Sequence, residues 1–169
     1  MTTMAGSVGG QAADAQREDA AAASGGRGTA QTTQVYSVFI RATPEQVWDA
    51  ITKPEFTQKY FFGASVEVRD GRRFTAVGDT EWDEEVLEED PPHKLVHGWI
   101  SAYDSEMAAE TESRVTWEIE PHDEGVSKLT VVHDQLEGAP KTAESVAGGW
   151  MYVLSGLKTL IETGKPLAG

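Results

Sequence analysis

Apolar and polar residues alternate along much of the chain beyond residue 34, which is the pattern of strands with one buried face. The segment 113–121 shows it most clearly, because Val115 and Trp117 share one face while Arg114 and Thr116 share the other. The same reasoning, with turn residues as boundaries, predicts about seven strands. We expect them over residues 35–40, 64–69, 72–77, 81–89, 94–102, 113–121 and 126–136, with a loop over about 103–111.

Turn and capping signals connect these strands. The Asp70-Gly71 pair between two strand-like segments is a hairpin signal. After the first strand, residues 43–46 read Thr-Pro-Glu-Gln, which supplies a capping box and a proline suited to a first helical turn. We therefore expect a short helix that ends at Lys53, followed by a second over 54–60. Short turns between the later strands predict an antiparallel meander.

Apolar residues near the C-terminus recur at helical spacing instead, and they predict a helix over 142–162 that Gly164 ends. A helix of about 20 residues spans about 30 Å, enough to cross a sheet. Gly148-Gly149 lies inside this helix, where each glycine costs about 1 kcal/mol relative to alanine. Two interpretations are open: close packing on the sheet, or room for a ligand beneath the helix. The fold class predicted is α+β, with the helix on one face of a curved antiparallel sheet.

Composition narrows the class of protein. Residues 1–33 carry few large apolar groups, so we expect a disordered N-terminal tail and one domain over 34–167. The absence of cysteine excludes disulfides, thiol catalysis and cysteine-bound zinc. No stretch has the apolar length of a membrane span, and no secretory signal is recognisable, so we expect a cytoplasmic protein without membrane insertion. A net charge of −14 repels phosphate backbones and disfavours nucleic acid as a partner.

Five segments occur in an order and spacing that match a known family: 40–48, 60–63, 85–96, 113–119 and 149–164. Together they resemble the Bet v 1/START-like (SRPBCC) superfamily, and within it the bacterial proteins similar to the C-terminal domain of the Hsp90 ATPase activator Aha1. The resemblance covers about residues 35–166. It implies a helix-grip fold, in which the sheet wraps around the C-terminal helix, with a cavity between the two. It implies neither one ligand nor one reaction.

The inward faces of these elements supply the candidate ligand-binding residues. Trp117 and Trp150 are the leading candidates, because both lie in the middle of an element on the predicted inward face, and aromatic walls are typical of small-molecule sites. The alternative is that they fill the core. The whole candidate set is Val38, Ile40, His97, Trp99, Val115, Trp117, Val131, His133, Gly149, Trp150 and Val153.

Histidines and acids are the remaining chemical candidates. His97 and His133 fall in phase with apolar neighbours and titrate near neutral pH when unperturbed, but a buried histidine with satisfied hydrogen bonds is the alternative interpretation. No spacing fits zinc, so no metal is predicted. The segment 81–90 holds seven acidic and no basic residues, which we interpret as a solvated strand edge. No nucleophile, phosphate-loop or dinucleotide motif is present, so no catalytic residue and no cofactor is predicted.

Three functions are compatible with this sequence. The first is binding or transport of a hydrophobic small molecule such as a lipid, a fatty acid or an aromatic metabolite. The second is a chaperone-cofactor or stress-response module that contacts a protein partner through its acidic surface. A homodimer is also compatible with the sequence. The third is an enzyme for an apolar or polyketide-like substrate, with His97, His133 or a cavity carboxylate as acid and base. We favour binding over catalysis because no catalytic constellation is visible.

Overall fold

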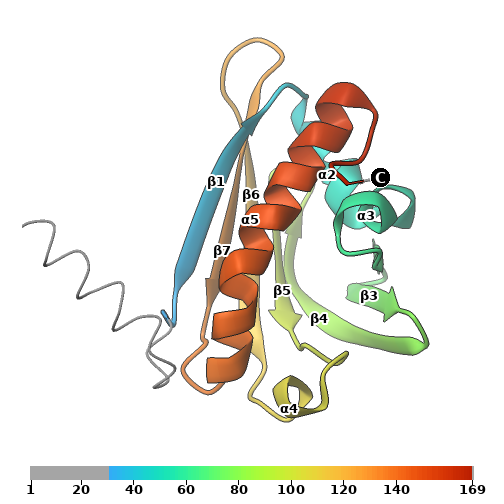
Figure 1. The fold of residues 1–169 in the computed structure, drawn as a ribbon. Helices are drawn as coiled ribbons and strands as arrows, with labels where there is room; N and C mark the ends of the chain where they lie inside the picture. Colours follow the sequence, from blue (N-terminus) through green and yellow to red (C-terminus); the bar gives the residue numbers. More distant parts are fainter. Residues whose placement is uncertain (1–30, 169) are drawn as a thin grey trace, which may run out of the picture. The chain divides into compact units, whose positions relative to one another are not determined.

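A computed structural model describes residues 31–168, in which seven strands form one antiparallel sheet and four helices accompany it (Figure 1). The strands lie in the order β1-β7-β6-β5-β4-β3-β2, so β2 to β7 form the expected meander and β1 pairs with β7. The elements are β1 (Gln34–Ile40), α2 (Pro44–Thr52), α3 (Pro54–Tyr60), β2 (Ser65–Arg69), β3 (Arg72–Val77), β4 (Thr80–Asp90), β5 (Lys94–Trp99), α4 (Ser105–Ala108), β6 (Ser113–Pro121), β7 (Ser127–Asp134) and α5 (Pro140–Thr163). The predicted α+β helix-grip fold is confirmed.

The helix caps and the hairpin turn form where the sequence predicts them. The Thr43 hydroxyl accepts from the Gln46 amide at 3.2 Å, and the Gln46 side chain accepts from the Thr43 amide at 2.8 Å, which completes the capping box of α2. Asp70 and Gly71 have φ angles of 52° and 73°, as a two-residue type I′ hairpin requires. Gly164 ends α5 in the left-handed conformation, with φ of 76°.

The long helix α5 lies along one face of the curved sheet, and Figure 1 shows α2 and α3 beside its C-terminal half. Helix α3 approaches α5 closely at Gly156, because a Cβ placed there would lie 3.2 Å from the Cβ of Tyr60. The core between α5 and the sheet includes Leu95, Trp117, Leu129 and other fully buried side chains. The first half of α5 is not covered by α2 or α3. The cavity described below lies beneath this half of the helix.

Three sequence-based expectations need correction. Strand β4 is not an edge, because it pairs with both β3 and β5. Its acids Glu81, Asp83 and Glu85 are exposed, but Glu84 is only 1% exposed and faces inward. The predicted loop over 103–111 contains the short helix α4, which Asp104 caps by accepting from two backbone amides. The strand expected to reach residue 102 ends at Trp99. Of the predicted tail over residues 1–33, residues 1–30 lie outside the described residues.

Candidate ligand-binding site

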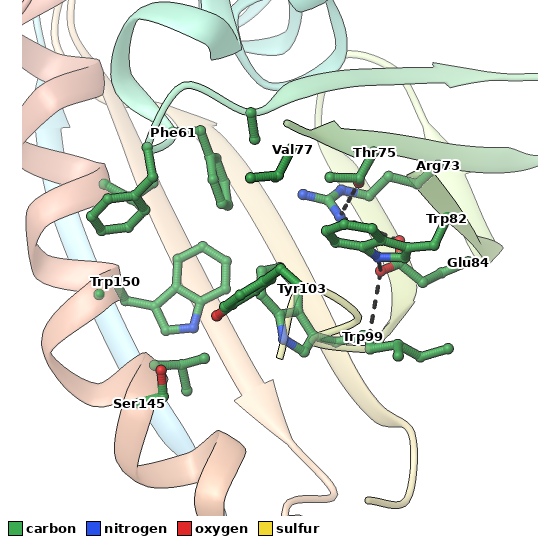
Figure 2. A pocket seen from close by; sticks show the side chains of 16 residues that line it. Phe61, Arg73, Thr75, Val77, Trp82, Glu84, Trp99, Tyr103, Ser145 and Trp150 are labelled. Carbon is green, nitrogen blue, oxygen red and sulfur yellow. Dashed lines mark hydrogen bonds and ion pairs between the residues drawn. The ribbon is translucent and has the colours of Figure 1, made fainter. Parts of the chain in front are cut away.

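A cavity of about 290 Å³ lies between the first half of α5 and the part of the sheet formed by β3, β4 and the end of β5 (Figure 2). Helix α5 contributes one wall, and the segment between α3 and β2 contributes another. Sixteen residues line it: Phe61, Phe62, Ala64, Arg73, Thr75, Val77, Trp82, Glu84, Trp99, Ile100, Tyr103, Ser145, Val146, Gly149, Trp150 and Val153. Phe62 and Tyr103 are 62% and 50% exposed, so they mark where the cavity opens to solvent.

Aromatic rings hold one another in place around this cavity. The ring centroid of Trp150 lies 5.4 Å from that of Trp99 and 6.0 Å from that of Phe61, and Trp117 packs edge-on behind it at 5.3 Å. Offset and edge-to-face contacts at such distances are favourable. The innermost wall is therefore a cluster of mutually packed aromatic rings. Nearer the opening, the ring centroids of Trp82 and Tyr103 lie 6.2 Å apart.

Gly149 sits where α5 faces the cavity. A Cβ at this position would meet only a Phe62 ring carbon, at 4.0 Å, whereas a Cβ at Gly148 would meet nothing within 4 Å. Gly148 is exposed and does not line the cavity. The two adjacent glycines therefore differ, because only Gly149 leaves space on the cavity side of the helix.

One ion pair provides all the charge of the cavity wall. The Arg73 Nη1 lies 3.3 Å from the Glu84 Oε2, and the two side chains are 3% and 0% exposed. The other Glu84 oxygen accepts from the Trp82 indole at 2.9 Å and from the Ile100 amide at 3.4 Å. Burial raises the pKa of the Glu84 carboxyl, while Arg73 and these hydrogen bonds act in the opposite direction. Both oxygens of Glu84 are thus used within the protein.

The two buried histidines lie behind the cavity wall rather than in it. The Trp117 indole donates to His97 Nε2 at 3.0 Å, so the proton on Nδ1 is donated to the Gly98 carbonyl at 2.7 Å. The Trp150 indole donates to His133 Nδ1 at 3.0 Å, and His133 Nε2 lies 2.8 Å from the hydroxyl of Ser113. Both rings are therefore neutral and fully hydrogen-bonded. Burial lowers the pKa of His97 well below its ordinary value and that of His133 to about 4.

The predicted site residues divide into two groups. Trp99, Gly149, Trp150 and Val153 line the cavity. The others do not: six are buried in the core and Val38 is half-buried against it. Those seven are Val38, Ile40, His97, Val115, Trp117, Val131 and His133. An acid–base role for His97 or His133 in this cavity thus has no geometric support.

The sequence did not lead us to predict the Arg73–Glu84 pair or most of the lining residues nearer the opening of the cavity. A signal was present, because Arg73 falls in phase with Thr75 and Val77 along β3, and Glu84 falls in phase with Trp82 along β4. A charged residue on the inward face of a strand marks a buried polar interaction. The loop residues Ile100 and Tyr103 gave no such signal, because no periodicity constrains a loop.

A second depression, of about 380 Å³, lies at the junction of α2 and α3 next to β2. It is larger than the first, but its wall carries mostly charged and polar groups, so it offers little to an apolar ligand. Its lining is Trp48, Asp49, Thr52, Lys53, Pro54, Glu55, Glu67, Val68 and Glu89. Within residues 31–168, no three histidine or acidic side chains converge to hold a metal ion. None of the helices in that range combines the length and hydropathy that a membrane crossing requires.

The sequence identifies the family. A family model described as Activator of Hsp90 ATPase homolog 1-like protein matches residues 41–162, from the end of β1 to the last turn of α5. The chain belongs to this family, and the expected resemblance is confirmed. No curated protein matches the sequence.

Solved structures share the fold at low sequence identity. DynU16, from the dynemicin biosynthetic locus, is 22% identical with a TM-score of 0.63; the match covers 80% of this chain and only 49% of DynU16. CalU16 from Micromonospora echinospora is 20% identical with a TM-score of 0.61, covering 80% of this chain and 77% of CalU16. PFC0360w, an HSP90 activator from Plasmodium falciparum, is 21% identical with a TM-score of 0.63, covering 80% and 99%. At these identities the similarity establishes the fold alone.

Proposed function

We propose that this chain binds a small hydrophobic molecule with a planar aromatic body in the cavity beneath α5. The observation that carries the proposal is the chemistry of the wall: of sixteen lining residues, only Arg73 and Glu84 are charged. Six of the others are aromatic: Phe61, Phe62, Trp82, Trp99, Tyr103 and Trp150. Apolar walls with a few placed polar groups are characteristic of ligand sites.

The volume of the cavity limits the size of the ligand. Sites for drug-sized molecules enclose about 300–1,000 Å³, and this cavity, at about 290 Å³, lies at the lower end. A compound of two or three rings suits this volume, whereas a two-chain membrane lipid does not. Binding would draw on apolar burial at about 25 cal/mol per Å², less the cost of immobilising the ligand.

The adjacent glycines of α5 provide a matched test. Gly149→Leu would place a side chain in the cavity, while Gly148→Leu would place the same side chain in solvent. We expect 2-acetylnaphthalene, titrated calorimetrically, to bind the native chain and the Gly148→Leu variant and to lose affinity for the Gly149→Leu variant. Thermal unfolding of both variants controls for folding. Absence of binding to the native chain, or equal binding to both variants, would contradict the proposal.

A protein partner is the second candidate, and two observations favour it. The fold is shared with an HSP90 activator, and the exposed face of β4 carries Glu81, Asp83 and Glu85. An acidic face of this kind would bind a basic surface in a salt-dependent manner. We expect a chaperone of the Hsp90 class to bind the native chain at low ionic strength. Replacing the three acids by Gln should abolish that binding, and binding unaffected by the replacement would argue against this surface.

A further inference from the structure

A buried cation lies in the mostly apolar wall of the cavity, and only one of its three nitrogens donates a hydrogen bond to the described part of the protein. The Arg73 side chain is 3% exposed, yet it belongs to the cavity wall. Figure 2 shows it extending from β3 toward the cavity interior, between the rings labelled Phe61 and Trp82. A guanidinium group is always charged and carries five N–H donors in a fixed plane. The partners of those donors therefore decide what the cavity accepts.

All the hydrogen bonds of this guanidinium within residues 31–168 come from one nitrogen. Nη1 donates to the Thr75 hydroxyl at 3.2 Å and to Glu84 at 3.3 Å. Nε and Nη2 have no partner among those residues. Among the same residues, every side-chain nitrogen or oxygen that is sealed from solvent has a hydrogen-bond partner. Nε and Nη2 of Arg73 are therefore accessible rather than sealed in the core, and the space that this side chain lines is the cavity.

This unused edge has a specific chemical preference. Nε–H and one Nη2–H point in parallel, and such a pair binds the two oxygens of a carboxylate side by side. Glu84 cannot occupy this edge, because its oxygens already accept from Nη1, the Trp82 indole and the Ile100 amide. Glu84 instead acts as a positioning residue that holds the guanidinium in place.

We propose that the ligand of this cavity is an apolar carboxylic acid, bound as its carboxylate to the Nε–Nη2 edge of Arg73, with its hydrophobic body against the aromatic wall. This inference rests on the proposed function and specifies its ligand class. The aromatic rings are placed for it, because the Arg73 Cζ lies 5.3 Å from the Trp99 ring centroid and 5.7 Å from that of Phe61. A flat ring attached to the carboxylate thus continues from the guanidinium onto these two rings.

Three probes separate charge from hydrophobicity. Naphthalene-2-carboxylate and 2-acetylnaphthalene have the same shape and differ in charge, and octanoate carries the same carboxylate on an aliphatic body. We expect the aromatic carboxylate to bind the native chain roughly 10-fold or more tightly than the neutral ketone, as a charge-assisted bidentate contact implies. Octanoate binding as tightly as the naphthalene carboxylate would show that a flat ring adds nothing to the affinity, which would contradict the aromatic part of the proposal.

Two variants move the affinity in opposite directions. Arg73→Lys keeps a cation opposite Glu84 but lacks the two-donor edge, so it should weaken the carboxylate roughly 10-fold while the ketone changes by less than about 3-fold. Glu84→Gln keeps the shape of the site and removes the competing negative charge, so it should tighten binding of the carboxylate relative to that of the ketone. Since the effects are opposite, a general loss of folding in either variant does not imitate them, and thermal unfolding monitors folding directly.

The outcomes distinguish the two claims. If the ketone and the carboxylate bind equally, and both variants affect them equally, the carboxylate proposal is overturned while hydrophobic binding stands. If neither probe binds the native chain, the proposed function fails and the carboxylate proposal fails with it. Preference for the carboxylate that disappears in Arg73→Lys and increases in Glu84→Gln supports the assignment.

Discussion

Acid is expected to destabilise this fold through His133, which lies directly behind the cavity wall. The neutral ring accepts from the Trp150 indole and contacts the Ser113 hydroxyl, and the side chain is fully buried. A proton added to Nδ1 would face the indole N–H, so that two donors would oppose each other. It would also bring a charge into an apolar environment. Protonation of the folded protein is therefore unfavourable.

The pKa of His133 gives the size of the expected loss in folding stability. Burial lowers the pKa of His133 from 6.5 to about 4, and a difference of about 2.5 units corresponds to about 3 kcal/mol. The unfolded chain binds the proton near pH 6.5 and the folded chain only near pH 4. This contribution to stability is therefore complete above pH 6.5 and is lost as the pH falls toward 4. His97 acts in the same direction, whereas Glu84, whose pKa burial raises, opposes it.

A variant isolates this contribution from the other titrations. The free energy of unfolding in urea is measured at about pH 7 and about pH 4.5 for the native chain and for His133→Gln, with His122→Gln as a solvent-accessible control. The stability difference between the native chain and His133→Gln should shrink by roughly 2–3 kcal/mol at the lower pH. The His122→Gln difference should not shrink in this way. A difference independent of pH, or an NMR titration of His133 with a midpoint near 6.5, would refute the reasoning.

Two further predictions concern α5 and the buried ion pair. Gly148→Ala should raise the free energy of unfolding by about 1 kcal/mol, because its Cβ meets nothing. Gly156→Ala should give no such gain, because its Cβ would crowd Tyr60; an equal gain in urea unfolding at both sites would contradict the close approach of α3. Arg73→Met should cost about 3–5 kcal/mol by leaving the Glu84 charge unpaired. Adding Glu84→Gln should recover much of that loss, and a double variant no more stable than Arg73→Met would show that charge pairing is not the cause.

The fold could be predicted from the sequence because local signals and periodicity agree. Alternation in 113–121 defines β6, and the capping box at Thr43 defines the start of α2. The exceptions lie where the signal is short or ambiguous. Helix α4 has only four residues, too few to show a helical period, although Asp104 is a suitable cap. The acidic segment of β4 was interpreted as a solvated edge because it holds seven acidic and no basic residues.

The site was harder to predict than the fold. Periodicity identifies which face of each strand points inward, so Trp99, Trp117 and His133 were all placed on inward faces. It does not show where inward side chains leave a space, because that depends on how α5 crosses the curved sheet. The core closes over β6 and β7, and the space remains near β3 and β4. Arg73 was not predicted because periodicity alone does not distinguish a buried charged residue of a strand from an exposed one.

The most direct test of ligand binding in this cavity is the ¹⁵N–¹H spectrum of the indole groups during titration with naphthalene-2-carboxylate. The chain has five tryptophans. Trp82, Trp99 and Trp150 line the cavity, while Trp48 lies at the separate depression beside α2. We expect the ligand to shift the indole signals of Trp82, Trp99 and Trp150 and to leave that of Trp48 unchanged. A saturated complex in which these three signals do not move, or in which Trp48 moves instead, would contradict the account.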